Sequence, residues 1–299
     1  MTNQRRQLIF AKGHGTGNDF IILPDPEARI DLSPDLIRAL CDRHRGIGAD
    51  GVLRVCRAGD LVASGALREL PGGVAAGDWF MDYRNADGTT AEMCGNGVRV
   101  FAHWLRSSGA TDSDTVRVGT RAGLRTVRIN DCVGTSAEIT VEMGLPEVTG
   151  VSTCAVSDQR FAGIGVDMGN PHLACVLPGL SAGELAELPV DRLFTLDPEF
   201  FPEGANIEIL TELVDGRVHM RVHERGAGET LSCGTGTVAA AVAALADAGE
   251  VTGEVTVVVP GGELTVVIRE DGATLTGPSL IVAEGTIDGD ALLADRSVG

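Results

Sequence analysis

Residues 232–249, with the sequence SCGTGTVAAAVAALADAG, carry the clearest signal of the architecture of this chain. It begins with a cysteine between small residues and continues as an apolar run that ends at Asp247. A segment that is apolar on all sides forms a stable helix only where other elements surround it. We therefore predict a helix that starts just after Cys233, ends near Gly249 and lies at the centre of a curved sheet.

A second segment, MCGNGVRVFAHWLRSSG at 93–109, resembles the first, and the two cysteines are 139 residues apart. Upstream, the sequence GND at 17–19 is echoed by GNP at 169–171. Two matches in the same order indicate a duplicated domain. The predicted fold class is therefore α/β (α+β), with two pseudo-symmetric halves, each a curved, mostly antiparallel, barrel-like sheet wrapped round a central helix.

The halves can be placed on the chain. The boundary falls near Gly144, which gives an N-terminal half over 1–144, completed by 277–299, and a C-terminal half over 145–276. Ser33 followed by Pro34 is a helix start signal and predicts a further helix over PDLIRALCDRH. Alternating or apolar runs predict strands at Leu8–Phe10, Phe20–Leu23, Asp78–Tyr83, Thr115–Val118, Ala137–Met143, Gly163–Asp167, His172–Val176, Ile207–Thr211, Val218–His223, Val255–Val259 and Leu264–Ile268.

Composition excludes several classes of function. The 299 residues include 24 Lys and Arg against 42 Asp and Glu, a net charge of −18, which disfavours nucleic acids and anionic membranes as partners. The N-terminal sequence lacks the long apolar stretch of a signal peptide, and no apolar run reaches membrane-spanning length. We expect a soluble cytoplasmic protein whose seven cysteines are reduced thiols.

Two of these cysteines are placed for chemistry. Cys94 and Cys233 each lie just before a predicted helix N-terminus, where the helix dipole and unpaired N–H groups favour a thiolate or a bound carboxylate. Two such thiols facing each other across an interdomain cleft suit racemisation or epimerisation, in which one thiolate removes an α-proton and the opposing thiol returns one to the other face. The remaining cysteines are expected to be buried small hydrophobes: Cys41, Cys56, Cys132, Cys154 and Cys175.

Other cofactor chemistries fit the residues poorly. A pyridoxal phosphate enzyme needs a Schiff-base lysine, and the single lysine, Lys12, lies in no obvious phosphate-binding loop. The sequence GHGTGND at 13–19 lacks the helix and ribose-binding acid of a dinucleotide site, and the cysteines lack the paired spacing of a zinc site. We therefore expect no cofactor and no metal. A dithiol redox protein remains the alternative outside the isomerases.

Six motifs together resemble the diaminopimelate epimerase family: NADG at 85–88, MCGNG at 93–97, GNPH at 169–172, ANIE at 205–208, HERGAGET at 223–230 and SCGTGT at 232–237. The resemblance covers essentially the whole chain. It implies an isomerase that interconverts LL- and meso-2,6-diaminopimelate without a cofactor by a two-base mechanism, in the supply of lysine and peptidoglycan precursors, and that is usually a homodimer. A related amino-acid racemase, such as a proline racemase-like enzyme, is the alternative within the same superfamily.

The resemblance also implies roles for individual residues. Cys94 and Cys233 become the proton acceptor and donor, with His172 and Glu224 tuning their pKa values. Substrate contacts are implied for Asn18, Asn85, Gly95, Asn96, Asn170, Asn206, Glu224, Arg225, Gly234 and Thr235. Gly51 stands where some relatives have a polar glutamine, so we assign it no substrate contact.

Overall fold

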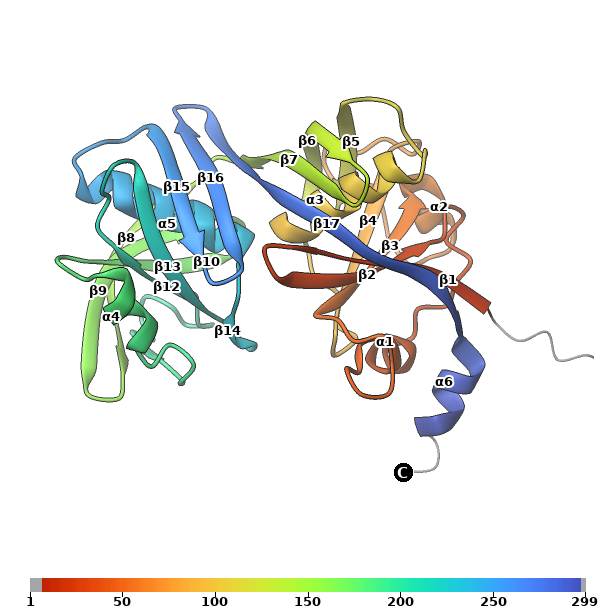
Figure 1. Ribbon diagram of the computed structural model, residues 1–299, viewed down its shortest axis with the longest axis horizontal. Helices are drawn as coiled ribbons and strands as arrows, with labels where there is room; N and C mark the ends of the chain where they lie inside the picture. Colours follow the sequence, from red (N-terminus) through yellow and green to blue (C-terminus); the bar gives the residue numbers. More distant parts are fainter. Residues whose placement is uncertain (1–6, 297–299) are drawn as a thin grey trace, which may run out of the picture. The chain divides into compact units, whose positions relative to one another are not determined.

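The computed structural model describes residues 7–296, which divide into two compact units (Figure 1). The first unit comprises 7–15, 19–139 and 279–296, and the second comprises 16–18 and 140–278. Within these residues, no helix combines the length and the apolarity needed to cross a lipid bilayer.

The first unit is a barrel of eight strands around one helix. The circuit of paired strands runs β1–β2–β3–β4–β5–β6–β7–β17 and closes through the antiparallel pairing of β17 with β1. The central helix α3 packs against five of the barrel strands. The strands are β1 (Gln7–Gly15), β2 (Asn18–Pro24), β3 (Gly51–Arg57), β4 (Trp79–Asn85), β5 (Thr115–Thr120), β6 (Gly123–Val133), β7 (Ser136–Gly144) and β17 (Gly272–Asp288). Asn18, the part of β7 beyond residue 139 and the part of β17 before residue 279 belong to the second unit. The helices are α1 (Pro34–Cys41), α2 (Ala58–Ala63), α3 (Gly95–Ser107) and α6 (Gly289–Arg296).

The second unit repeats this plan around the helix α5 (Gly234–Asp247), which packs against six strands and is buried along most of its length. Its sheet is mixed, since β10–β12 and β13–β15 are parallel pairs. The strands are β8 (Glu147–Val156), β9 (Gln159–Asp167), β10 (Pro171–Leu177), β11 (Thr195–Leu196), β12 (Asn206–Thr211), β13 (Arg217–Glu224), β14 (Gly228–Thr230), β15 (Gly253–Val259) and β16 (Gly262–Arg269), and a short helix, α4, spans Ala182–Glu187.

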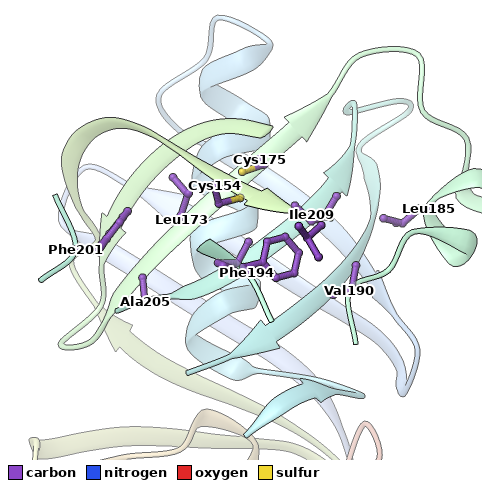
Figure 2. Close-up of a cluster of buried hydrophobic side chains, with 11 residues drawn as sticks. Cys154, Leu173, Cys175, Leu185, Val190, Phe194, Phe201, Ala205 and Ile209 are labelled. Carbon is purple, nitrogen blue, oxygen red and sulfur yellow. The ribbon is translucent and has the colours of Figure 1, made fainter. Parts of the chain in front are cut away.

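A hydrophobic cluster covers one face of this sheet and leaves the other face to α5. Leu173 and Cys175 on β10 join Ile207 and Ile209 on β12 in the cluster, together with aromatic side chains from the segment that follows α4 (Figure 2). Because side chains alternate along a strand, the intervening residues of β10 and β12 point to the opposite face. That face carries the polar groups of the candidate site.

The predicted fold class is confirmed, as are the two central helices that start after the Cys-Gly turns. Gly109 and Gly249, just beyond those helices, have φ of 74° and 80°, the left-handed conformation that commonly follows a helix end. The first helix is shorter than predicted: α1 ends at Cys41, and Asp42 is its C-cap in extended backbone.

Candidate active site

Each of the two predicted reactive cysteines is the N-cap residue of a central helix. Cys94 precedes α3 with φ −142° and ψ 116°, and Cys233 precedes α5 with φ −123° and ψ 120°. In both turns Sγ accepts a hydrogen bond of 3.4 Å from the backbone N–H three residues on, at Gly97 and at Gly236. Sulfur thus replaces the side-chain oxygen that usually caps a helix. The dipole and N–H groups favour a negative charge at each sulfur.

The surroundings of Cys233 oppose that charge. Its side chain is buried, and burial raises the pKa of Cys233 well above its usual value. The negative charges of Glu224 and Glu208 raise this pKa further, while hydrogen bonds from Thr235 and from the helix backbone lower it. The Thr235 hydroxyl lies 3.5 Å from Sγ. In this environment Cys233 is a thiol, the form that can give a proton to a carbanion.

Glu224 is at the end of β13, beside the second thiol. Desolvation raises the pKa of its carboxyl, and the charge of Glu208 adds to the rise. Hydrogen bonds from Thr230 and Cys233 and the charge of His172 act in the opposite direction. A carboxyl in contact with a thiol can exchange a proton with it.

His172 and Glu208 form a completely buried pair in the second unit, with Nδ1 of the imidazole 2.7 Å from Oε1 of the carboxyl. Glu208 lies in the ANIE motif, but sequence reasoning gave it no role. The available signal was an acidic residue within a predicted strand of mostly apolar residues. Carboxylates are almost never fully buried unless they are paired.

Arg225 and Asn206 are joined by a hydrogen bond between the Arg225 backbone and the Asn206 side chain. The Asn206 amide oxygen accepts a hydrogen bond of 2.8 Å from the Arg225 N–H. The exposed Arg225 guanidinium donates to the carbonyl of Glu203 at 3.2 Å. A planar guanidinium on an exposed turn beside buried β12 is available to bind a carboxylate.

The turn between β1 and β2 belongs to the second unit. The Thr16 hydroxyl donates to the Ser232 hydroxyl at 2.7 Å, and the tight approach of Thr16 to Gly261 leaves no room for a side chain there. These contacts hold Asn18 in the same unit as Cys233, although the two are far apart in the sequence. Asn170 lies in the turn between β9 and β10, where its carbonyl accepts from Met168 N–H at 3.1 Å.

The first unit holds a smaller set of predicted site residues. Gly95 and Asn96 are buried in the first turn of α3, directly after Cys94. Asn85 ends β4 and donates from Nδ2 to the Thr89 hydroxyl at 3.0 Å.

Arg99, one turn further along α3, is a charged group that the sequence did not single out. It is completely buried, and burial lowers its pKa to about 10, while the negative charge of Cys94 acts to raise it. A buried cation close to the first thiol has no counterpart among the groups that shift the pKa of Cys233.

The structure therefore gathers the predicted residues into two groups. The second unit holds Cys233, Gly234, Thr235, His172, Glu224, Arg225, Asn206, Asn170 and Asn18, and the first unit holds Cys94, Gly95, Asn96 and Asn85.

One prediction about the remaining cysteines is wrong. Cys41, Cys56, Cys154 and Cys175 are buried as expected, but Cys132 is only partly buried. It lies near the end of β6, between the exposed residues Asp131 and Val133.

Solved structures of other proteins share this fold. A hydroxyproline epimerase from Agrobacterium vitis matches with a TM-score of 0.66 and 17% identity, over 96% of this chain and 94% of that one. A probable proline racemase from Agrobacterium radiobacter matches with a TM-score of 0.63 and 16% identity, over 94% and 92%. The chain thus shares its fold with a hydroxyproline epimerase and a probable proline racemase.

Sequence comparison narrows the class to one family. The sequence model of diaminopimelate epimerase matches residues 10–149 and 164–282. The diaminopimelate epimerase of Corynebacterium aurimucosum is 61% identical over 93% of this chain and 99% of its own length, and that of Mycolicibacterium smegmatis is 56% identical over 94% and 97%. This chain belongs to the diaminopimelate epimerase family.

Proposed function

We propose that this protein interconverts LL- and meso-2,6-diaminopimelate by a cofactor-independent two-base mechanism, with Cys94 and Cys233 as the bases. It would serve lysine and peptidoglycan precursor synthesis as a cytoplasmic homodimer. The observation that carries the proposal is the pair of cysteine N-caps, one on the central helix of each unit, in a chain with the identities given above.

Substrate binding follows from the two helix starts. We infer that the carboxylate at the reacting carbon binds the N–H groups of Gly95-Asn96 and Gly234-Thr235, since a helix N-terminus attracts an anion. The distal carboxylate would pair with Arg225, and the side-chain amides would bind the distal amino and carboxylate groups; these amides belong to Asn18, Asn85, Asn170 and Asn206.

The chemical step needs one base and one acid on opposite faces of the α-carbon. A thiolate takes the α-proton, the carbanion is stabilised beside the two helix N-termini, and the opposing thiol donates a proton to the other face. Cys233, whose raised pKa keeps it protonated, is suited to be the acid in one direction. In the reverse direction Glu224 would take up the proton of Cys233 and so generate the thiolate.

The test is turnover of LL-diaminopimelate by the purified, reduced protein in deuterated water. We expect both stereoisomers at equilibrium by chiral chromatography, deuterium at the α-carbon, and no effect of a chelator or of carbonyl reagents that trap pyridoxal phosphate. Cys94→Ala and Cys233→Ala should each abolish epimerisation, although the remaining thiol of either variant can still exchange the α-proton. Cys132→Ala, at a partly buried thiol of β6, is the matched control. Near-full turnover by Cys94→Ala would refute the two-base mechanism.

Two further assays separate this proposal from its alternatives. Turnover of proline or trans-4-hydroxyproline in place of diaminopimelate would indicate a racemase with a different substrate. Reduction of protein disulfides with no change in the isomer ratio would indicate a dithiol redox protein.

A further inference from the structure

The strand register of the second unit brings the buried side chains of His172 and Glu208 together. On the parallel strands β10 and β12, His172 is paired with Asn206, and Glu208 lies two residues further along β12. Residues two apart on a strand share a face, so the sheet itself brings the imidazole and the carboxyl together. Both side chains are completely inaccessible to solvent, and their bond is 2.7 Å long.

Each member of the pair has one polar atom that makes no hydrogen bond within residues 7–296. Among the described residues, no hydrogen-bond partner is found for Oε2 of Glu208 or for Nε2 of His172. Burying a carboxylate or an imidazole with an unused polar atom destabilises the fold, because water that would have bound that atom has been removed. Such a cost persists most readily where the group has a functional task.

The pair also touches the helix start that carries the second thiol. A Cβ placed on Gly236 would come within 2.4 Å of Oε1 of Glu208, so the carboxyl lies against the first turn of α5. The N–H of the same glycine donates to Sγ of Cys233. Glycine at this position is therefore what allows the carboxyl and the thiol cap to be neighbours.

The charges of these groups act on one another. Glu208 raises the pKa of both Cys233 and Glu224, whereas His172 lowers that of Glu224. Four titratable groups on β10, β12, β13 and α5 thus form one electrostatic unit: His172, Glu208, Glu224 and Cys233.

We propose that Glu208 is a positioning residue for His172: as a carboxylate it accepts the Nδ1–H and so leaves Nε2 as the nitrogen that exchanges protons. This inference rests on the function proposed above. A carboxylate can only accept hydrogen bonds, so the shared proton must reside on Nδ1. When Nε2 takes a proton from a thiol, the products are a thiolate and an imidazolium, and Glu208 supplies the opposite charge to that imidazolium. Return of the proton to the thiolate restores the starting state. The arrangement follows the logic in which a base is oriented by a third group.

The test combines a spectroscopic and a kinetic measurement. In the reduced, ¹⁵N-labelled protein, His172 is assigned by comparison with His172→Gln, and its imidazole nitrogens should show the Nδ1–H tautomer. In Glu208→Gln, whose amide can either accept or donate, we expect a mixture of tautomers. We also expect kcat for diaminopimelate to fall by roughly 10-fold or more, within the range that acid–base catalysis supplies, while KM changes little. Glu254→Gln removes the same charge from an exposed position of β15 and serves as the control.

The outcomes separate this inference from the proposed function. An Nε2–H tautomer in the unsubstituted protein refutes the positioning role whether or not the protein is an epimerase, and this measurement needs no variant to fold. An unchanged kcat in a folded Glu208→Gln refutes it as well. If the Nδ1–H tautomer is present and lost in Glu208→Gln but diaminopimelate is not turned over, the positioning role stands and the proposed function fails. Glu208→Asp, which restores the carboxylate, should recover part of the kcat lost in Glu208→Gln.

Discussion

Gly97 and Gly236 occupy the same position in the two helix starts, three residues after the N-cap cysteine, yet the same substitution should affect them differently. Alanine in place of glycine within a helix contributes about 0.5–1 kcal/mol of stability. At Gly97 the new methyl would lie 3.3 Å from Cδ2 of Leu53, the tip of a flexible side chain that can move by a few tenths of an ångström. For Gly97→Ala we therefore expect a free energy of unfolding within about 0.5 kcal/mol of the original.

Gly236→Ala meets a different neighbour. The methyl would lie 2.4 Å from Oε1 and 3.1 Å from Cδ of Glu208. A carboxyl on the surface would swing away at little cost, but this one is completely buried and bonded to His172. Overpacking of a core typically costs about 1–3 kcal/mol. After the helix gain of about 0.5–1 kcal/mol is subtracted, Gly236→Ala should destabilise by up to roughly 2.5 kcal/mol, or a few degrees in Tm, and should lower kcat because it displaces Glu208.

The assay uses the distribution of tryptophan. Trp79 and Trp104 are the two tryptophans of the chain, and both lie in the first unit. Fluorescence in urea therefore reports the unit of Gly97, whereas circular dichroism and calorimetry report both units. A double-mutant cycle with Glu208→Ala isolates the clash, since the loss caused by Gly236→Ala should shrink when the carboxyl is absent. Equal losses at the two glycines, or a loss that is independent of Glu208, would refute the reasoning.

Three further outcomes are expected. Arg225→Lys keeps the charge but loses the planar fork, so kcat/KM should fall by the equivalent of roughly 1–3 kcal/mol; an unchanged value would remove Arg225 from the site. If Cys94 and Cys233 act on one carbon as proposed, mild oxidation should inactivate the enzyme reversibly, with a peptide map that links the two cysteines; inactivation with both of these thiols still free would contradict that proposal. Glu224→Gln should stabilise the fold at pH 8 but not at pH 4. The pKa of Glu224 is raised on folding, so its stabilising contribution is present below the ordinary pKa of about 4.3 and is lost as the pH rises through the folded value. Urea transitions at the two pH values test this, and an equal effect at both would count against a raised pKa.

Local signals were enough to predict the two helix starts. A cysteine followed by glycines and a long apolar run specifies a turn, a helix and its surroundings within about twenty residues. The predicted strands are those with alternating or continuous apolar residues, and every one of them overlaps an observed strand.

Two of the strands that escaped prediction, β3 and β17, depend on distant partners. In β3 a charged residue, Arg54, interrupts the apolar run but is only 3% exposed, because Asp25 and Asp82 lie 3.7 and 3.6 Å from its Nε. The long strand β17 contains Pro278, which reads as a break. Instead the proline lies where the strand passes from one unit to the other, and β17 pairs with β16 before it and with β1 after it.

The sequence predicted no role for Glu208 because its partner is distant in the chain. Its partner, His172, is 36 residues away and belongs to a different strand. No spacing rule links the two residues, and only the parallel register of β10 with β12 places the imidazole and the carboxyl on one face. Sequence reasoning finds groups that act through neighbouring residues in the chain and misses those that act across a sheet.

The two thiols are equivalent in backbone geometry and unequal in charge environment. Both cap a helix through the same 3.4 Å bond from a glycine N–H. Close to Cys94 the structure buries a cation, Arg99, whereas the groups that shift the pKa of Cys233 include two carboxyls that raise it. A two-base epimerase needs one thiolate and one thiol at the start of each turnover, and two identical sites would share the proton without preference. In the proposed mechanism, the residues that differ between the copies, Arg99 in one and Glu208 with Glu224 in the other, would favour the proton on the sulfur of Cys233.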